Sequence, residues 1–210
     1  MARAVALAAV LAVVLAGCGK NGSKTATSAA PPAPTPATGG PPWPAPDNAM
    51  ELTRRAGLKP EHAEFLQYHV HAHLYVFVNG QAVRIPAGIG IDIHDPGVQS
   101  APLQDGTTAY GSIQYCKHVC ISPLHTHDDS GILHTETKTP SPNTLGQFFT
   151  EWNVRLDPNC VDGFCKPGSA IEILVDGKPF SGDPRTIELA DRTVIVIVIG
   201  SPPATIPTAF

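Results

Sequence analysis

The feature that most constrains the fold of this chain is an Asn-Gly pair between two alternating runs of side chains. Residues 69–78 alternate His or aromatic residues with apolar ones, Asn79-Gly80 follows, and residues 81–86 alternate again. Both residues of a two-residue hairpin turn adopt positive φ, which Asn and Gly tolerate best. The pattern therefore predicts a β-hairpin that turns at Asn79-Gly80.

The turn also decides which side chains share a face of the hairpin. It places Val76 opposite Val83 and Leu74 opposite Ile85 on one apolar face. Because side chains alternate between faces, the other face carries the polar and aromatic members of the first run: His69, His71, His73, Tyr75 and Phe77.

A second histidine-rich segment, residues 124–136, also has the pattern of a tight hairpin, with its turn inside residues 128–131. A four-residue loop places His125 opposite His134, whereas a two-residue loop places His127 opposite His134. In both registers three histidines and Glu136 share one face, because the side-chain period is two.

These two segments predict a metal site. Imidazoles roughly 5 Å apart on paired strands can bind one ion at about 2.0 to 2.1 Å per bond, and imidazole with carboxylate suits copper or zinc. We expect the hairpins to pack side by side and to supply three or four ligands. The candidates are His71, His73, His125, His127 and His134, with His69 and Glu136 in reserve.

Each segment taken alone has a simpler interpretation. The first is then the polar outer face of a half-buried strand, and the second is a good turn with polar neighbours. Three further histidines, His62, His94 and His118, are isolated and are expected to be ordinary surface residues.

The N-terminus has the pattern of a lipoprotein signal. Arg3 precedes an Ala/Val/Leu run that is too short to span a bilayer, and Leu15-Ala16-Gly17-Cys18 matches a lipobox. We expect residues 1–17 to be a signal peptide that is cleaved before Cys18. Palmitate-type acyl chains on Cys18 would then anchor the protein to the outer face of the cell membrane. The alternative is an ordinary secretory signal with an incidental cysteine.

Composition divides the rest of the chain into two parts. Residues 18–47 are rich in Pro, Ala, Gly and Ser, which predicts a disordered tether, and residues 48–210 are long enough for a single folded domain. The formal net charge is −4, and removing Arg3 with the signal peptide makes it −5. With no basic patch, we expect no nucleic-acid partner.

Four cysteines remain after the lipid site: Cys116, Cys120, Cys160 and Cys165. An even number outside the cytoplasm predicts two disulfides, for which three connectivities are open. A four-cysteine zinc site is the alternative, although neither spacing is the two-residue spacing of zinc ribbons.

The remaining elements predict an α+β fold of mostly antiparallel strands with one main helix. A short helix is expected over residues 60–67, with Phe65 and Leu66 facing the core. A capping box at Thr144 and Gln147 opens the main helix, which extends to about Trp152. Two strands follow, Ile171–Val175 before a turn at Asp176-Gly177 and the continuous apolar run Val194–Ile199. This order of elements favours a β-grasp-like sheet with a His-rich hairpin insertion, and a β-sandwich is the alternative.

Four motifs resemble those of a group of exported bacterial and archaeal proteins, including lipoproteins. They are His71-Ala-His73-Leu, Ile85-Pro86-Ala-Gly-Ile89-Gly90-Ile91, His125-Thr-His127-Asp-Asp-Ser130-Gly131-Ile-Leu-His134-Thr-Glu136 and Thr144-Leu-Gly-Gln-Phe-Phe149-Thr-Glu-Trp152. The resemblance covers most of the folded part and implies export. It carries no activity with it.

The leading hypothesis is a membrane-anchored extracytoplasmic lipoprotein that binds copper or zinc for scavenging, buffering or delivery. Its partners would be the membrane, through the lipid anchor, and an envelope protein that exchanges the metal. One alternative is a metal-dependent enzyme with an open three-histidine site. The other is a surface module that binds a partner and whose histidines respond to pH.

Overall fold

The computed structural model describes Met1 and residues 40–210. The predicted signal peptide, Cys18 and most of the predicted tether therefore lie outside the described residues. Residues 40–210 all belong to one compact unit. Within the described residues, no helix is both long enough and apolar enough to cross a membrane.

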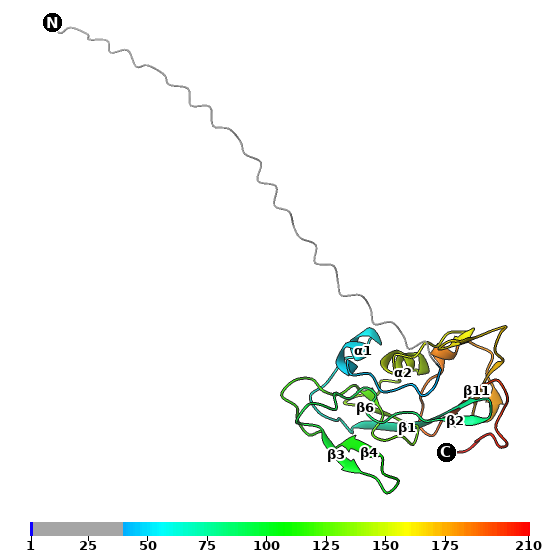
Figure 1. The fold of residues 1–210 in the computed structure, drawn as a ribbon. Coiled ribbons are helices and arrows are strands. Elements are labelled where there is room, and N and C mark those ends of the chain that lie inside the picture. The colour runs from blue at the N-terminus through cyan, green and yellow to red at the C-terminus, as the bar shows by residue number, and fades with distance from the viewer. Residues whose placement is uncertain (2–39) are drawn as a thin grey trace. The chain divides into compact units, whose positions relative to one another are not determined.

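Two parallel strands form the centre of the main sheet (Figure 1): β1 (Tyr68–Val78) and β11 (Val194–Ile199). Every residue of β11 is buried. Its isoleucines belong to the main core, whereas its valines belong to a second apolar cluster with Phe77 and Leu174 on the opposite face. The prediction of a central strand covered on both faces is confirmed.

The other strands extend the sheet on both sides of this pair. Next to β11 lie β9 (Ile171–Val175) and β10 (Lys178–Pro179), joined by the predicted turn, in which Asp176 and Gly177 have φ of 50° and 73°. On the side of β1 away from β11, the end of β1 pairs with β2 (Gln81–Val83) and its first half pairs with β6 (Ile132–Thr137). Strand β5 (Leu124–His125) then pairs with β6.

The first hairpin has the expected turn and register, but it is shorter than expected. Asn79 and Gly80 have φ of 50° and 78°, and Val76 pairs with Val83 as predicted. Pairing ends there, since the Leu74 amide donates to the Gly131 carbonyl at 2.9 Å and not to the segment around Ile85.

This topology confirms the α+β class. The sheet order is β10-β9-β11-β1-β6-β5, and the first and last strands lie parallel in its centre, as in a β-grasp arrangement. The only other sheets in the described residues are two-stranded: β3 (Gln99–Pro102) with β4 (Thr108–Gly111), and β7 (Cys160–Val161) with β8 (Phe164–Cys165). The sandwich alternative requires a second large sheet, so the β-grasp-like description fits better.

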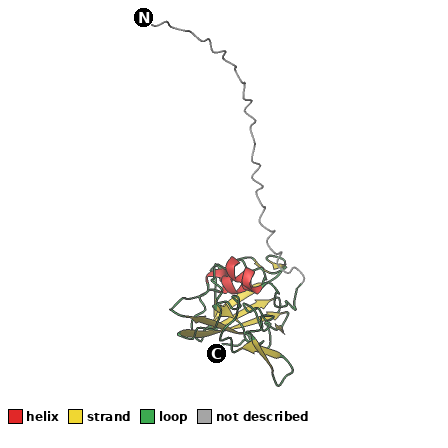
Figure 2. Cartoon of the chain, turned by 90° about the vertical axis from the view of Figure 1, so that its left-hand side faces the viewer, coloured by secondary structure: helices red, strands yellow, loops and turns green. Residues whose placement is uncertain are grey.

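Two short α-helices lie together on one side of the main sheet (Figures 1 and 2): α1 (Ala49–Arg55) and α2 (Leu145–Glu151). The predicted capping box of α2 is present, because Gln147 N donates to the Thr144 hydroxyl and the Gln147 side chain accepts from Thr144 N. The helix buries its apolar residues in the main core, together with the Trp152 that follows: Leu145, Phe148 and Phe149. A 3₁₀ turn, η1 (Pro184–Thr186), lies against α2.

The helix predicted over residues 60–67 is wrong. The backbone there hydrogen bonds to a distant segment: Glu61 N donates to Ile121 O at 2.7 Å and Glu64 N to Ile113 O at 3.0 Å. Leu66 is 59% exposed and does not face the core. Long-range pairing thus replaces the local hydrogen bonds of a helix, and the N-terminal helix is α1 instead.

The folded part begins before Asn48. Trp43, which lies within the predicted tether, is 2% exposed and lies edge-to-face against Trp152 at 5.6 Å between ring centroids. Its indole nitrogen donates to the buried Asp162 at 3.0 Å, and the Trp152 indole donates to the Trp43 carbonyl at 3.2 Å. The Pro-rich composition around Trp43 conceals this tertiary contact.

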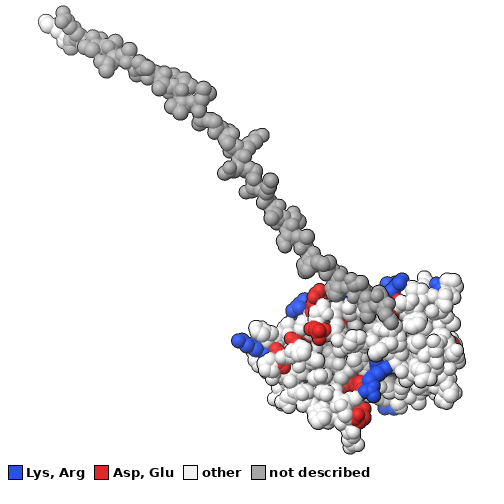
Figure 3. Space-filling model, viewed as in Figure 1, with Lys and Arg blue, Asp and Glu red and all other residues white. Residues whose placement is uncertain are grey.

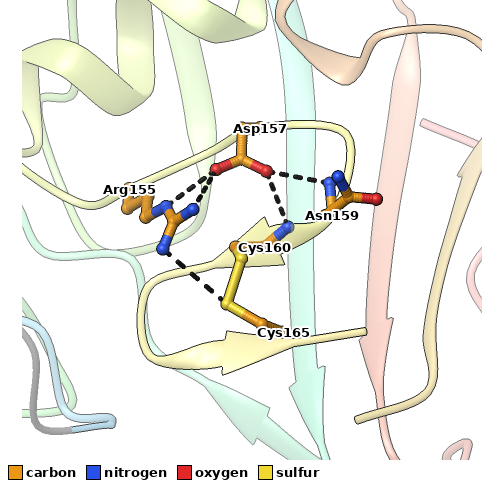
Figure 4. The surroundings of a disulfide bond; sticks show 5 residues. All are labelled: Arg155, Asp157, Asn159, Cys160 and Cys165. Atoms are coloured by element: carbon orange, nitrogen blue, oxygen red, sulfur yellow. Dashed lines mark hydrogen bonds and ion pairs between the residues drawn. A yellow bond between two sulfur atoms is a disulfide. The ribbon is translucent and has the colours of Figure 1, made fainter. Parts of the chain in front are cut away.

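The cysteines form two local disulfides, Cys116–Cys120 and Cys160–Cys165, which decides among the three connectivities and rules out the four-cysteine zinc site. The first is buried in a third apolar cluster with Ile91, Ile113 and Ile121. The second joins β7 to β8 beside the Arg155–Asp157 ion pair (Figure 4).

Charged residues are scattered on the face of the molecule shown in Figure 3. Blue and red side chains alternate with uncharged surface, and this face has no continuous basic area.

Candidate metal centre

Strand β6 lies between β1 and β5 and brings the two histidine-rich segments together. His134 on β6 pairs with His71 on one side and with His125 on the other. Side chains directly opposite each other on paired strands share a face of the sheet, so the three imidazoles form one row across it. The prediction that the two segments pack side by side is confirmed.

The turn between β5 and β6 selects the register. His125 lies opposite His134, which corresponds to the four-residue loop. Asp128 closes this loop by accepting the Ser130 amide at 2.9 Å, and Gly131 follows with φ of 87°. A Cβ at Gly131 would lie 2.5 Å from the Leu74 carbonyl oxygen, so only glycine fits where the loop meets β1.

The next row of the sheet adds a carboxylate to the imidazoles. Glu136 pairs with His69 across β1 and β6, and its side chain is almost fully buried. Glu136 Oε1 lies 3.1 Å from His69 Nε2, 3.3 Å from His134 Nδ1 and 3.6 Å from His127 Nε2. One carboxylate oxygen therefore lies at the meeting point of three imidazoles.

Backbone carbonyls orient the rings of His125 and His127. His125 Nδ1 lies 2.9 Å from Ser122 O, and His127 Nδ1 lies 2.6 Å from Tyr110 O. A carbonyl can only accept, so both Nδ1 atoms carry the proton, and in the neutral ring Nε2 carries the lone pair. The two Nε2 atoms lie 3.2 Å apart and face each other.

The distances among these donor atoms match the edges of a metal coordination shell. Two ligands at about 2.05 Å from a tetrahedral ion lie about 3.3 Å apart. The ligand atoms of two groups each lie within 4.8 Å of one another. One group is His125, His127, His134 and Glu136, and the other is His69, His71 and His134. The structure thus has a buried His/Glu cluster that can hold a metal ion.

The second hairpin is held in place by the segment around residues 88–91. Ser122 N donates to Gly90 O at 2.7 Å and Thr126 N to Ile89 O at 3.1 Å. Gly90 has φ of 74°, and a Cβ there would collide with the Leu124 carbonyl oxygen. The chain therefore approaches β5 closely enough to support His125 from behind.

Burial and neighbouring charges perturb the protonation of the cluster. Burial, followed by the proximity of His127, lowers the pKa of His125 to about 3. Burial also lowers the pKa of His134 and of His71. Burial alone would raise the pKa of Glu136, but hydrogen bonds from His127 and His134 outweigh it and hold that pKa below its ordinary value. The carboxylate of Glu136 therefore stays ionised and is ready to bind a cation.

His127 differs from the other buried histidines. Burial lowers its pKa, but the hydrogen bonds to Glu136 and Tyr110 O and the charge of Glu64 outweigh burial, so the pKa of His127 is raised. A proton on His127 and a metal ion therefore compete for the same nitrogen.

Glu64 belongs to this centre and was missed in the sequence. Its Oε1 lies 3.9 Å from His127 Nε2, and burial raises the pKa of Glu64. Both Glu64 Oε1 and Glu136 Oε2 are buried without a hydrogen-bond partner among the described residues. A cavity of about 10 Å³ lies between Glu64, His125 and Glu136. No local signal marks Glu64, because it lies in the irregular segment before β1.

The remaining histidines lie outside the cluster. His73, a predicted ligand, pairs with Ile132, donates from Nε2 to Ser130 O at 2.9 Å and stacks on Tyr75. The structure does not place His73 with the other donors, because this hydrogen bond turns its ring toward the loop. His94 and His118 are exposed, and His62 bonds through Nδ1 to Cys116 O at 3.0 Å.

Comparisons with known proteins assign no family, since no family model, no curated protein and no solved structure matches the chain significantly.

Proposed function

We propose that this protein is an extracytoplasmic lipoprotein that binds copper or zinc through the histidine cluster, for scavenging, buffering or delivery of the metal. One observation carries the proposal. The Nε2 atoms of His125 and His127 face each other at 3.2 Å while both Nδ1 atoms are committed to backbone carbonyls. A proton or a cation must lie between these nitrogens, and the distance is that of two ligands on one ion.

The chemistry of the donors supports a transition metal. Imidazole nitrogen and carboxylate oxygen suit Zn(II) and Cu(II), whereas Ca²⁺ and Mg²⁺ take oxygen ligands. The four cysteines described are oxidised to disulfides, so no thiolate among them competes for the ion. A site built from imidazole and carboxylate ligands also tolerates an oxidising compartment.

The proposal for location rests on the lipobox before Cys18, on the disulfides, and on the resemblance to exported proteins. Acyl chains on Cys18 would hold the domain at the outer face of the membrane, where an envelope protein could receive the metal. Labelling with a fatty-acid analogue tests this: the wild type should incorporate the label and fractionate with the membrane, whereas Cys18→Ser should not incorporate it. Wild type found in the soluble fraction would contradict the anchor.

Metal binding is tested by elemental analysis of the untagged full chain. The wild type should contain at least one copper or zinc ion per chain, and His125→Ala/His127→Ala should contain one ion fewer than the wild type. Because His125 is fully buried, Glu136→Gln is a second variant of unchanged shape that should weaken binding without leaving a cavity. The matched control is His94→Ala/His118→Ala, which removes two exposed imidazoles.

Circular dichroism of each variant checks that the fold is retained. Wild type without metal, together with no calorimetric uptake of added Cu(II) or Zn(II), would refute the proposal. Equal metal loss in the His94/His118 control would show non-specific binding by surface imidazole.

A second candidate function is a metal-dependent enzyme, which is favoured by the cavity beside His125. Its volume of about 10 Å³ is on the scale of a single water position. A water bound there would lie beside the carboxylates of Glu64 and Glu136, and this function requires that the water also reaches the ion. Azide added to the Cu(II)-loaded protein tests this, because a change in the absorption spectrum requires a replaceable ligand, and an unchanged spectrum excludes an open site.

A further inference from the structure

The centre offers more donor atoms than one ion can use. Seven side chains converge within it: His69, His71, His125, His127, His134, Glu64 and Glu136. A zinc ion in a protein takes four ligands, occasionally five. Two or three of the seven would therefore remain as unpaired buried or half-buried polar groups, which proteins avoid.

The donors separate into an outer and an inner set. The outer set lies nearer to solvent: the His69 side chain is 33% exposed, whereas that of His125 is 0% exposed. His134 Nδ1 lies 3.1 Å from His71 Nε2 and 3.5 Å from His69 Nε2, which are the edge lengths of a second coordination shell.

His134 can serve only one of the two sets through this nitrogen. The Nδ1 atom carries a single lone pair, and an imidazole nitrogen binds one metal. His134 belongs to both groups of donor atoms, but the imidazole nitrogens in hydrogen-bond range of its Nδ1 are those of His71 and His69. We therefore assign His134 to the outer set, with His69 and His71.

The inner set then consists of His125 and His127, whose donor atoms form a group with Glu136, and Glu64 is the further carboxylate beside His127. His125 and His127 present their Nε2 atoms to each other at 3.2 Å, and Glu64 Oε1 lies 3.9 Å from His127 Nε2. The Glu64 oxygen is buried and has no hydrogen-bond partner among the described residues. A second cation would satisfy it.

Glu136 connects the two sets through its separate oxygens. Oε1 faces the outer set, at 3.1 Å from His69 Nε2 and 3.3 Å from His134 Nδ1. Oε2 lies 3.8 Å from His125 Nε2 and makes no hydrogen bond within the described residues. A carboxylate with one oxygen toward each set is placed to bridge two ions.

We propose that the centre binds two transition-metal ions bridged by Glu136, an inference that rests on the proposed metal-binding function. The outer ion is held by His69, His71 and His134, and the inner ion by His125, His127 and Glu64. Two-metal sites in proteins hold their ions about 3.5 to 4 Å apart, a spacing that a bridging carboxylate spans.

Zinc titration of the metal-free full chain, followed by native mass spectrometry, tests the stoichiometry. The wild type should bind two Zn(II) per chain. Both His69→Ala/His71→Ala and His125→Ala/His127→Ala should bind one, and the control His94→Ala/His118→Ala should bind two. Cu(II) provides an independent measurement: magnetic coupling should weaken or broaden the paramagnetic resonance signal of the two-ion form, and His69→Ala/His71→Ala should restore a full mononuclear signal.

The outcomes separate this inference from the proposed function. One Zn(II) per wild-type chain would overturn the two-ion centre and leave metal binding in place. No Zn(II) and no Cu(II) would overturn both. Two ions retained in His69→Ala/His71→Ala would overturn the assignment of the outer ligands and with it the inference. The wild-type count alone is decisive, so a misfolded variant does not leave the question open.

Discussion

A buried carboxyl group behind the metal centre leads to a prediction about stability. Glu151, at the end of α2, has no exposed surface and accepts a hydrogen bond from the Thr53 hydroxyl of α1 at 2.8 Å. No cation pairs with it among the described residues. Burial raises the pKa of Glu151 to about 8, against the lowering effect of the Ser122 and Thr53 hydroxyls.

The sign of the effect follows from proton binding. In the unfolded chain Glu151 titrates near its ordinary value of 4.5, and in the folded chain it titrates near 8. Between these values the folded state keeps a proton that the unfolded state releases. The free energy of unfolding therefore falls as pH rises from about 4.5 to 8 and stays constant above that range. The difference corresponds to roughly 5 kcal/mol at most.

Glu151→Gln should remove this pH dependence. Glutamine has the same shape, stays neutral and keeps an acceptor for Thr53. At pH 5 the free energy of unfolding of the variant should lie within about 1 kcal/mol of the wild-type value. At pH 9 it should be several kcal/mol higher than the wild-type value. Urea unfolding of the metal-free protein at pH 5, 7 and 9 measures this. Glu172→Gln replaces an exposed carboxyl group of β9; it is the control and should leave the pH dependence of the unfolding free energy unchanged. If the free energy of unfolding of Glu151→Gln changes with pH in parallel with that of the wild type over this range, the reasoning is refuted.

Three further predictions concern the centre and its supporting loop. Glu136→Gln should weaken Zn(II) binding by at least about 100-fold in chelator competition. This loss exceeds the 10- to 100-fold effect typical of residues that only support the ligands. An unchanged affinity would contradict a direct contact between Glu136 and the ion. Because the pKa of His127 is raised, Zn(II) binding should release more protons at pH 6 than at pH 9, and the affinity for Zn(II) should fall as pH falls. Calorimetry in buffers of different ionisation enthalpy measures the proton release. Equal proton release at both pH values would contradict the prediction. Gly131→Ala should destabilise the fold by more than about 2 kcal/mol, because its Cβ would meet a backbone oxygen. Gly106 has a similar φ of 85° but open space around it. Gly106→Ala should therefore cost only the strain of positive φ, about 1–2 kcal/mol. Equal losses in the two variants would show that the close contact at Gly131 has no effect.

Several elements could be predicted because their signals are local. Asn79-Gly80 specifies a turn through two φ angles, and the capping box at Thr144 satisfies the amides of its own helix. The all-apolar run Val194–Ile199 can only be covered on both faces. The helix expected over residues 60–67 had similar local support, but its amides bond to carbonyls about 50 residues or more away. Local propensity yields to such pairing when the rest of the fold supplies the partners.

The sequence by itself determined which side chains could share a face, because the period of two along a strand is a property of the backbone and needs no neighbour. It therefore identified the candidate ligands His71, His73, His125, His127 and His134, with His69 and Glu136 in reserve. Only the tertiary structure decided that β6 inserts between β1 and β5 and that His73 turns away. It also decided that Glu64 lies beside His127 and that Trp43 joins the hydrophobic core. These placements depend on contacts between residues about 60 to 110 positions apart. Such contacts form only when the burial gained by the whole domain offsets the entropy of closing long loops, and no short pattern in the chain records that balance.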